Sequence, residues 1–171
     1  MHLYLVQHGA AKAESEDPQR GLTDEGRRTV ERMAEFCSSL GLQVDRIEHS
    51  EKLRARQTAE IFAARLRSSE GTKQVSGIAP NDDVEPLRAR LEKEPKNLMM
   101  VGHLPYLSRL VARLLGLAAD QTVVQFHMGG VVRMDREETG RWVVRWVLTP
   151  ELLPSHRVAG TAGESTGQRS P

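Results

Sequence analysis

Short apolar runs alternate with longer amphipathic segments along the first two thirds of the chain. Residues 2–7 form an apolar run that stops at a His-Gly pair, which predicts a buried strand. A polar loop over residues 9–21 follows. Thr23 with two acidic residues directly after it then predicts the start of a helix, because a threonine hydroxyl caps a helix and acids suit its N-terminal dipole. Apolar residues at helical spacing continue this helix until Gly41, a typical helix end.

The alternation of strands and helices continues to Gly116. Residues 44–49 predict a second strand, and Ser50 is a suitable N-cap for the helix that follows it. The further predicted elements are a strand over 74–78, a helix over 82–94, a strand over 98–101 and a helix from Pro105 to Gly116. The strand over 98–101 is apolar throughout, as in strands covered on both faces. The pattern therefore predicts an α/β fold, a three-layer sandwich with a mostly parallel central sheet.

The last third of the chain has a different pattern. Its predicted strands cover 123–126, 131–134 and 142–148, and a turn over 137–140 joins the last two. From Ser155 onward the sequence is rich in Gly, Ser, Thr and Arg and has no apolar periodicity. We therefore expect one domain over residues 1–154 and a disordered tail over residues 155–171.

Composition excludes several functions. The 171 residues, 39% of them hydrophobic, suffice for one ordinary globular domain. A net charge of +1 gives no electrostatic reason to expect nucleic acid or a membrane as a partner. Cys37 is the only cysteine, so no internal disulfide can form, and the apolar run near the N-terminus is too short for a signal peptide. These features predict a cytoplasmic protein.

Three side chains that suit phosphate chemistry follow different strands of the predicted sheet. His8 and His103 each come after a strand and beside a glycine, while Arg54 lies early in the helix after the strand over 44–49. Ligands of open α/β sheets bind at the carboxyl ends of the strands, so these side chains are expected to converge. Two imidazoles and a forked guanidinium suit a phosphoryl group, with one imidazole as the nucleophile.

Each of these residues also has a simpler interpretation. A histidine at a strand end is often only a hydrogen-bonded structural residue. Arg54 lies close to Lys52 and Arg56, as in a solvated basic helix face. A metal site is the other chemical alternative, but no pair of histidines has the short spacing of zinc ligands. The pattern alone therefore leaves the three side chains as candidates.

Four ordered blocks of sequence narrow the interpretation. They are residues 5–9 (Leu-Val-Gln-His-Gly), 20–26 (Arg-Gly-Leu-Thr-Asp-Glu-Gly), 49–59 (His-Ser-Glu-Lys-Leu-Arg-Ala-Arg-Gln-Thr-Ala) and 101–105 (Val-Gly-His-Leu-Pro). Together they resemble the signatures of the histidine phosphatase superfamily, whose fold is phosphoglycerate mutase-like. Among its members, the short chain and the His-Leu-Pro sequence most resemble the SixA-type phosphohistidine phosphatases, over roughly residues 1–150.

The resemblance implies a two-step hydrolysis. His8 would attack phosphorus to form a phosphohistidine on the enzyme, and water would then release phosphate, with Arg54 and His103 holding the phosphoryl oxygens. It also implies phosphate-binding roles for Gln7, Gly9 and Arg20, and it implies no metal and no other cofactor. The expected partner is a histidine phosphotransfer domain that carries phosphohistidine, or a small phosphorylated substrate. The ring nitrogen of His8 that does not attack is expected to bond to a backbone carbonyl near Gly9.

Two residues depart from the family pattern. Gln7 replaces the usual arginine before the nucleophile, so the pocket has one positive charge fewer, and weaker phosphate binding or slower turnover is expected. Lys12 and Arg20 are the candidates to supply that charge. Ala10 stands where related short chains often carry an acid.

The sequence contains no clear general acid for an alcohol leaving group. Relatives that cleave phosphate esters use a glutamate, and the candidates here are only loop residues: Glu14, Asp17, Asp82 and Asp83. A departing imidazole, with a pKa of about 6.5, needs an acid less than an alkoxide does. This favours phosphohistidine as the substrate. Two alternatives stay open, a small-molecule phosphomonoesterase that uses the same site and a catalytically impaired phosphate- or phosphoprotein-binding domain.

Overall fold

A six-stranded sheet with the strand order β3-β2-β4-β1-β5-β6 forms the middle layer of the protein. The computed structural model describes residues 1–154. The strands are β1 (His2–Gln7), β2 (Arg46–His49), β3 (Thr72–Gln74), β4 (Leu98–Gly102), β5 (Val131–Arg136) and β6 (Trp142–Leu148). The helices are α1 (Asp24–Ser39), α2 (Leu53–Leu66), α3 (Glu85–Leu91) and α4 (Tyr106–Leu114), with a 3-10 turn η1 (Pro150–Leu152). The tail predicted over 155–171 lies outside the described residues.

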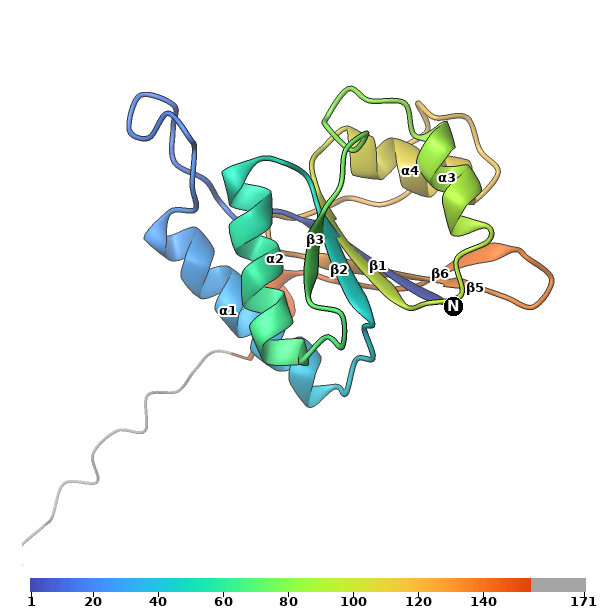
Figure 1. Ribbon diagram of the computed structural model, residues 1–171, viewed down its shortest axis with the longest axis horizontal. Coiled ribbons are helices and arrows are strands. Elements are labelled where there is room, and N and C mark those ends of the chain that lie inside the picture. Colours follow the sequence, from blue (N-terminus) through green and yellow to red (C-terminus); the bar gives the residue numbers. More distant parts are fainter. Residues whose placement is uncertain (155–171) are drawn as a thin grey trace, which may run out of the picture.

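The sheet is mostly parallel and is covered on both faces. Strands β1, β2, β3 and β4 run parallel to one another, and β5 is antiparallel to both of its neighbours. Helices α1 and α2 pack on one face and α3 and α4 on the other (Figure 1). Successive residues of β1 point into opposite cores, Leu3 and Leu5 toward α3 and α4, Tyr4 and Val6 toward α1 and α2. The predicted three-layer α/β architecture is confirmed.

Some predicted element boundaries are wrong, and tertiary contacts explain why. Residues 123–126 are not a strand, although Val124 and Phe126 are buried in the core on the α4 side. The apolar pattern there reports burial and not strand pairing. Of the strand predicted over 74–78 only Gln74 is in a strand, because β3 covers Thr72–Gln74, and the helix predicted over 82–94 is shortened to α3. Thr23 is the predicted cap of α1, its hydroxyl accepting the N–H of Gly26 at 2.9 Å.

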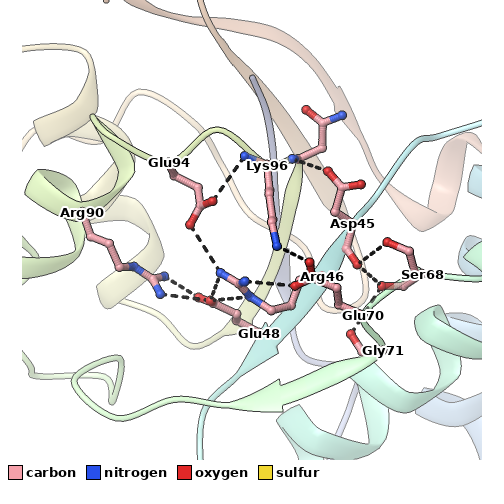
Figure 2. A network of polar contacts seen from close by, with 11 residues as sticks. Asp45, Arg46, Glu48, Ser68, Glu70, Gly71, Arg90, Glu94 and Lys96 are labelled. Carbon is pink, nitrogen blue, oxygen red and sulfur yellow. Dashed lines mark hydrogen bonds and ion pairs between the residues drawn. The ribbon is translucent and has the colours of Figure 1, made fainter.

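A buried carboxylate anchors strand β2 through a network of ion pairs (Figure 2). Glu48 is fully buried and accepts hydrogen bonds from Arg46 at 3.0 Å and from Arg90 of α3 at 2.9 Å. Arg46 also pairs with Glu70 at 3.1 Å and Glu94 at 3.3 Å, which lie in the loops before β3 and after α3. A buried carboxylate without such partners would be strongly unfavourable. The network thus fixes β2 within the sheet.

No helix within residues 1–154 is both long and apolar enough to span a lipid bilayer.

Candidate active site

The carboxyl ends of neighbouring strands bring the predicted catalytic side chains together. His8 follows β1, His103 follows β4, and these two strands are adjacent in the sheet. The N–H of His8 donates to the carbonyl of Gly102 at 3.2 Å, which ties the two histidine-bearing segments to each other. Arg54 reaches the same place from the first turn of α2. The convergence expected from the sequence is therefore present.

His8 is held as a neutral imidazole with one nitrogen able to react. Its Nδ1 lies 2.8 Å from the carbonyl oxygen of Gly9, the kind of bond that the resemblance implies, so Nδ1 carries the proton and Nε2 a lone pair. Arg54 Nε donates to that lone pair at 3.2 Å. Burial is the main cause that lowers the pKa of His8 to about 4; the charges of Arg54 and Arg20 lower it too, against the bond to Gly9, which raises it. The ring is therefore uncharged at neutral pH.

His103 lies against His8 with one ring nitrogen bonded and the other without a partner. The two ring centroids are 4.9 Å apart, with the ring planes at 57°. Nε2 of His103 lies 2.6 Å from Oγ of Ser50, whereas its Nδ1 is buried and has no hydrogen-bond partner within residues 1–154. Burial lowers the pKa of His103 to about 3, helped by His8 and by the charges of Arg54 and Lys52. A ligand that bonds to the unpartnered Nδ1 would remove the cost of leaving it buried.

Ser50 is a site residue that the sequence interpretation missed. Helix α2 begins at Leu53, its cap is Lys52, and no side chain caps it. The Ser50 hydroxyl, expected at the helix end, contacts His103 instead. Serine before a helix usually indicates capping, and only its place in the third sequence block could have indicated the contact.

Two side chains of α2 fix the loops around His8. The Thr58 hydroxyl donates to the carbonyl of Arg54 at 2.8 Å and accepts the N–H of Gly9 at 3.1 Å. Oε1 of Gln57 accepts the N–H of Leu22 at 2.7 Å, in the loop before α1. The Gln-Thr pair of the third sequence block therefore holds the helix that carries Arg54 against the nucleophile's loop.

Both backbone groups of Gly9, for which a phosphate-binding role is expected, have partners within the protein. Its N–H is already bonded to Thr58 and its carbonyl to His8, so the N–H is not free for a phosphoryl oxygen. A Cβ at this position would lie 2.7 Å from the Val30 side chain of α1, which is closer than packed atoms approach. The glycine is therefore needed so that α1 can pack against the loop that holds His8.

Gln7 and Arg20 lie beside the histidines. Gln7 is 8% exposed, and its carbonyl accepts the N–H of Gly129 at 2.8 Å. Arg20 is exposed, and its Nε donates to the carbonyl of Lys12 at 3.4 Å. The charge of Arg20 lowers the pKa of both His8 and Arg54. Of the two candidates for the missing charge, Arg20 is thus the one with an electrostatic effect on the nucleophile.

The loop acids are engaged in local hydrogen bonds. The Asp17 carboxylate accepts the N–H groups of Gly21 and Gln19, both at 2.9 Å, and these bonds lower its pKa. Asp82 accepts the N–H of Ala79 at 2.7 Å, and Asp83 caps the start of α3 at Glu85. Within residues 1–154 none of these carboxylates is bonded to a catalytic candidate, and no three His, Cys, Asp or Glu side chains are grouped to hold a metal ion.

Comparisons with known proteins identify a family and several similar proteins. Residues 3–75 match the family model of the histidine phosphatase superfamily (branch 1). An uncharacterized protein of Picosynechococcus is 36% identical over 112 residues, which cover 61% of this chain and 67% of the relative. The phosphohistidine phosphatase SixA of Escherichia coli is 25% identical over 155 residues, covering 88% of this chain and 94% of the relative. The solved structure of the protein histidine phosphatase SixA complexed with tungstate superimposes on this chain with a TM-score of 0.80 at 24% sequence identity. The match covers 90% of this chain and 100% of that one.

Proposed function

The chain belongs to the histidine phosphatase superfamily and is a phosphatase, and from that premise we propose that it hydrolyses phosphohistidine with His8 as the nucleophile. One observation carries this proposal. The Nε2 lone pair of a neutral His8 faces the guanidinium of Arg54 at 3.2 Å while Nδ1 is held by a carbonyl. The proposed nucleophile and a cation that can bind phosphate thus lie side by side.

The proposed reaction has two displacements at phosphorus. Nε2 of His8 forms a bond to phosphorus while the bond from phosphorus to the substrate's imidazole nitrogen breaks, and the departing nitrogen takes a proton from solvent. Water then attacks phosphorus, the bond to Nε2 breaks, and phosphate leaves with His8 again neutral. Arg54 would move its hydrogen bonds from the lone pair of His8 to the phosphoryl oxygens, and His103 would hold another oxygen.

The surroundings of the site favour cleavage of a P–N bond. A phosphate ester needs an acid that protonates an alkoxide, but the hydrogen bonds to Asp17 lower its pKa and keep it ionised. Asp82 and Asp83 hold nearby backbone N–H groups. A departing imidazole does not need such an acid near neutral pH, because its own pKa is about 6.5.

A phosphorylated protein is the proposed substrate, and the cytoplasm is the proposed location. The SixA relative is by name a phosphohistidine phosphatase, and it matches this chain along 94% of its own length. A histidine phosphotransfer domain presents a phosphohistidine on a protein surface and fits this chemistry. The single cysteine, Cys37, is free and buried, which suits a reducing compartment.

The test compares P–N with P–O substrates at the same site. The wild-type chain and His8→Ala are each assayed with three substrates: a histidine phosphotransfer domain phosphorylated on histidine, a phosphoserine peptide and p-nitrophenyl phosphate. We expect the highest kcat/KM for the phosphohistidine protein and no turnover of it by His8→Ala. Faster hydrolysis of the two esters would overturn the proposed substrate, and undiminished turnover by His8→Ala would overturn the proposed nucleophile.

A further inference from the structure

Ser50 is fixed at all of its polar groups. Its N–H donates to the carbonyl of Val101 on β4 at 3.3 Å, and its carbonyl accepts from Nδ1 of His49 at 2.8 Å. Its hydroxyl lies 2.6 Å from Nε2 of His103 and accepts the N–H of Lys52 at 3.4 Å. The residue is 2% exposed, so water does not compete freely for these bonds. The hydroxyl is thus held in place between Nε2 of His103 and the N–H of Lys52.

The bonds around this hydroxyl favour one of the two neutral tautomers of His103. A neutral imidazole has one N–H donor and one acceptor, and the partner of one nitrogen sets the role of the other. The Ser50 oxygen accepts the N–H of Lys52, and among the described residues Nε2 of His103 is the acceptor within reach of the Ser50 hydrogen, which favours donation to Nε2. Nε2 is then the acceptor, and the proton lies on Nδ1.

Nδ1 is the nitrogen of His103 that has no partner within residues 1–154. It is buried, and its ring centroid lies 4.9 Å from that of His8. The unprotonated oxygens of a phosphoryl group bound at His8 are hydrogen-bond acceptors. A ring with its proton on Nε2 would present a lone pair to those oxygens and repel them, whereas a ring with its proton on Nδ1 donates to them.

We propose that Ser50 is a positioning residue that holds His103 in the tautomer with the proton on Nδ1, so that Nδ1–H donates to a phosphoryl oxygen during transfer to and from His8. The inference rests on the proposed function for the identity of that oxygen. Ser50 thereby gains a role beside the catalytic candidates His8, Arg54 and His103, and Nδ1 is the atom of His103 that donates.

The first test reads the tautomer directly. The chain is labelled with 15N-histidine, and long-range 1H–15N spectra at neutral pH report which ring nitrogen is protonated; the signal of His103 is identified by its loss in His103→Gln. We expect the proton on Nδ1 in the wild type and a mixture of tautomers, or the proton on Nε2, in Ser50→Ala. A proton on Nε2 in the wild type, or an unchanged tautomer in Ser50→Ala, would overturn the inference.

The second test measures the kinetic consequence. Loss of one neutral hydrogen bond that strengthens in the transition state lowers the rate by about tenfold. We therefore expect Ser50→Ala to lower kcat by about this factor with an unchanged KM for the phosphorylated phosphotransfer domain. Ser50→Thr keeps a hydroxyl and is expected to restore the tautomer and most of kcat. An undiminished kcat in Ser50→Ala would contradict the proposed role.

A matched control separates positioning from general stability. Ser38→Ala removes a hydroxyl that donates to the carbonyl of Arg65 at 3.1 Å, away from the site, and is expected to leave the spectrum of His103 and kcat unchanged. The two proposals also fail in different ways. If the wild type hydrolyses no phosphohistidine substrate, the proposed function is wrong, while the spectra of the wild type and Ser50→Ala still decide whether Ser50 sets the tautomer of His103.

Discussion

Replacing Gln7 with arginine tests how this pocket holds phosphate with one charge fewer than its family pattern. Gln7 directly precedes His8 and is 8% exposed. Hydrogen bonds to a charged donor contribute about 1.5–3 kcal/mol, against about 0.5–1.5 kcal/mol for neutral ones. The gain of roughly 1.4 kcal/mol corresponds to about tenfold tighter binding of a phosphate oxyanion.

The assay is competitive inhibition by inorganic phosphate, together with kcat/KM for the phosphorylated phosphotransfer domain. We expect Gln7→Arg to lower the inhibition constant of phosphate by about tenfold at low salt, with a smaller gain at high salt because the added charge is screened. The added cation is also expected to lower the pKa of His8 further, as Arg54 and Arg20 already do.

Gln7→Met is the matched control, because it keeps the length of the side chain and removes the amide. It is expected to weaken phosphate binding by about fivefold, the value of one neutral hydrogen bond of about 1 kcal/mol. Thermal unfolding of both variants shows whether the larger arginine disturbs the fold. Phosphate inhibition that is the same in all three folded proteins would refute the reasoning, since position 7 would then not face the phosphoryl group.

Three further predictions concern charge and stability. Arg54→Lys keeps the charge but not the forked donor, so kcat/KM is expected to fall by about 10²-fold with an unchanged melting temperature. An unchanged kcat/KM in steady-state kinetics would contradict this prediction. Because the pKa of folded His8 is about 4 and that of an unfolded histidine about 6.5, the unfolded state takes up the proton first as the pH falls through this window. The unfolding free energy should drop by on the order of 3 kcal/mol on this account, and urea unfolding of His8→Gln should show a shallower pH dependence than the wild type. Glu48→Ala leaves Arg46 and Arg90 without their buried counter-charge and is expected to cost about 3 kcal/mol in urea unfolding, whereas a loss below about 1 kcal/mol would contradict the role of the network.

Much of the site follows from the sequence because parallel strands place their carboxyl ends at the same edge of the sheet. His8 and His103 each follow a strand. Those two strands are neighbours in the sheet, so two blocks that are distant in the sequence lie side by side at the site. The three-layer fold was predictable for the same reason, since strands buried on both faces are apolar throughout.

The residues that the sequence did not assign depend on tertiary hydrogen bonds. Ser50 has the sequence signature of a helix cap, yet its hydroxyl bonds to a histidine 53 positions away in the chain. Gly9 was expected to bind phosphate, but its N–H is taken by Thr58 of α2, a contact that no local pattern reveals. In the segment 123–126 the apolar residues Val124 and Phe126 are buried although no strand forms there. The local pattern indicates which apolar residues are buried, and it does not specify which partner a polar group finds.

The most direct test of the account is to trap phosphate on the nucleophile. The chain is mixed with a phosphotransfer domain phosphorylated on histidine, quenched in alkali within the first turnover, digested and analysed by mass spectrometry. The account predicts an alkali-stable, acid-labile phosphoryl group on the peptide that contains His8, and its absence in His8→Ala. Phosphate release by the wild type with no label on His8 at any time, or a label on His103 instead, would contradict it.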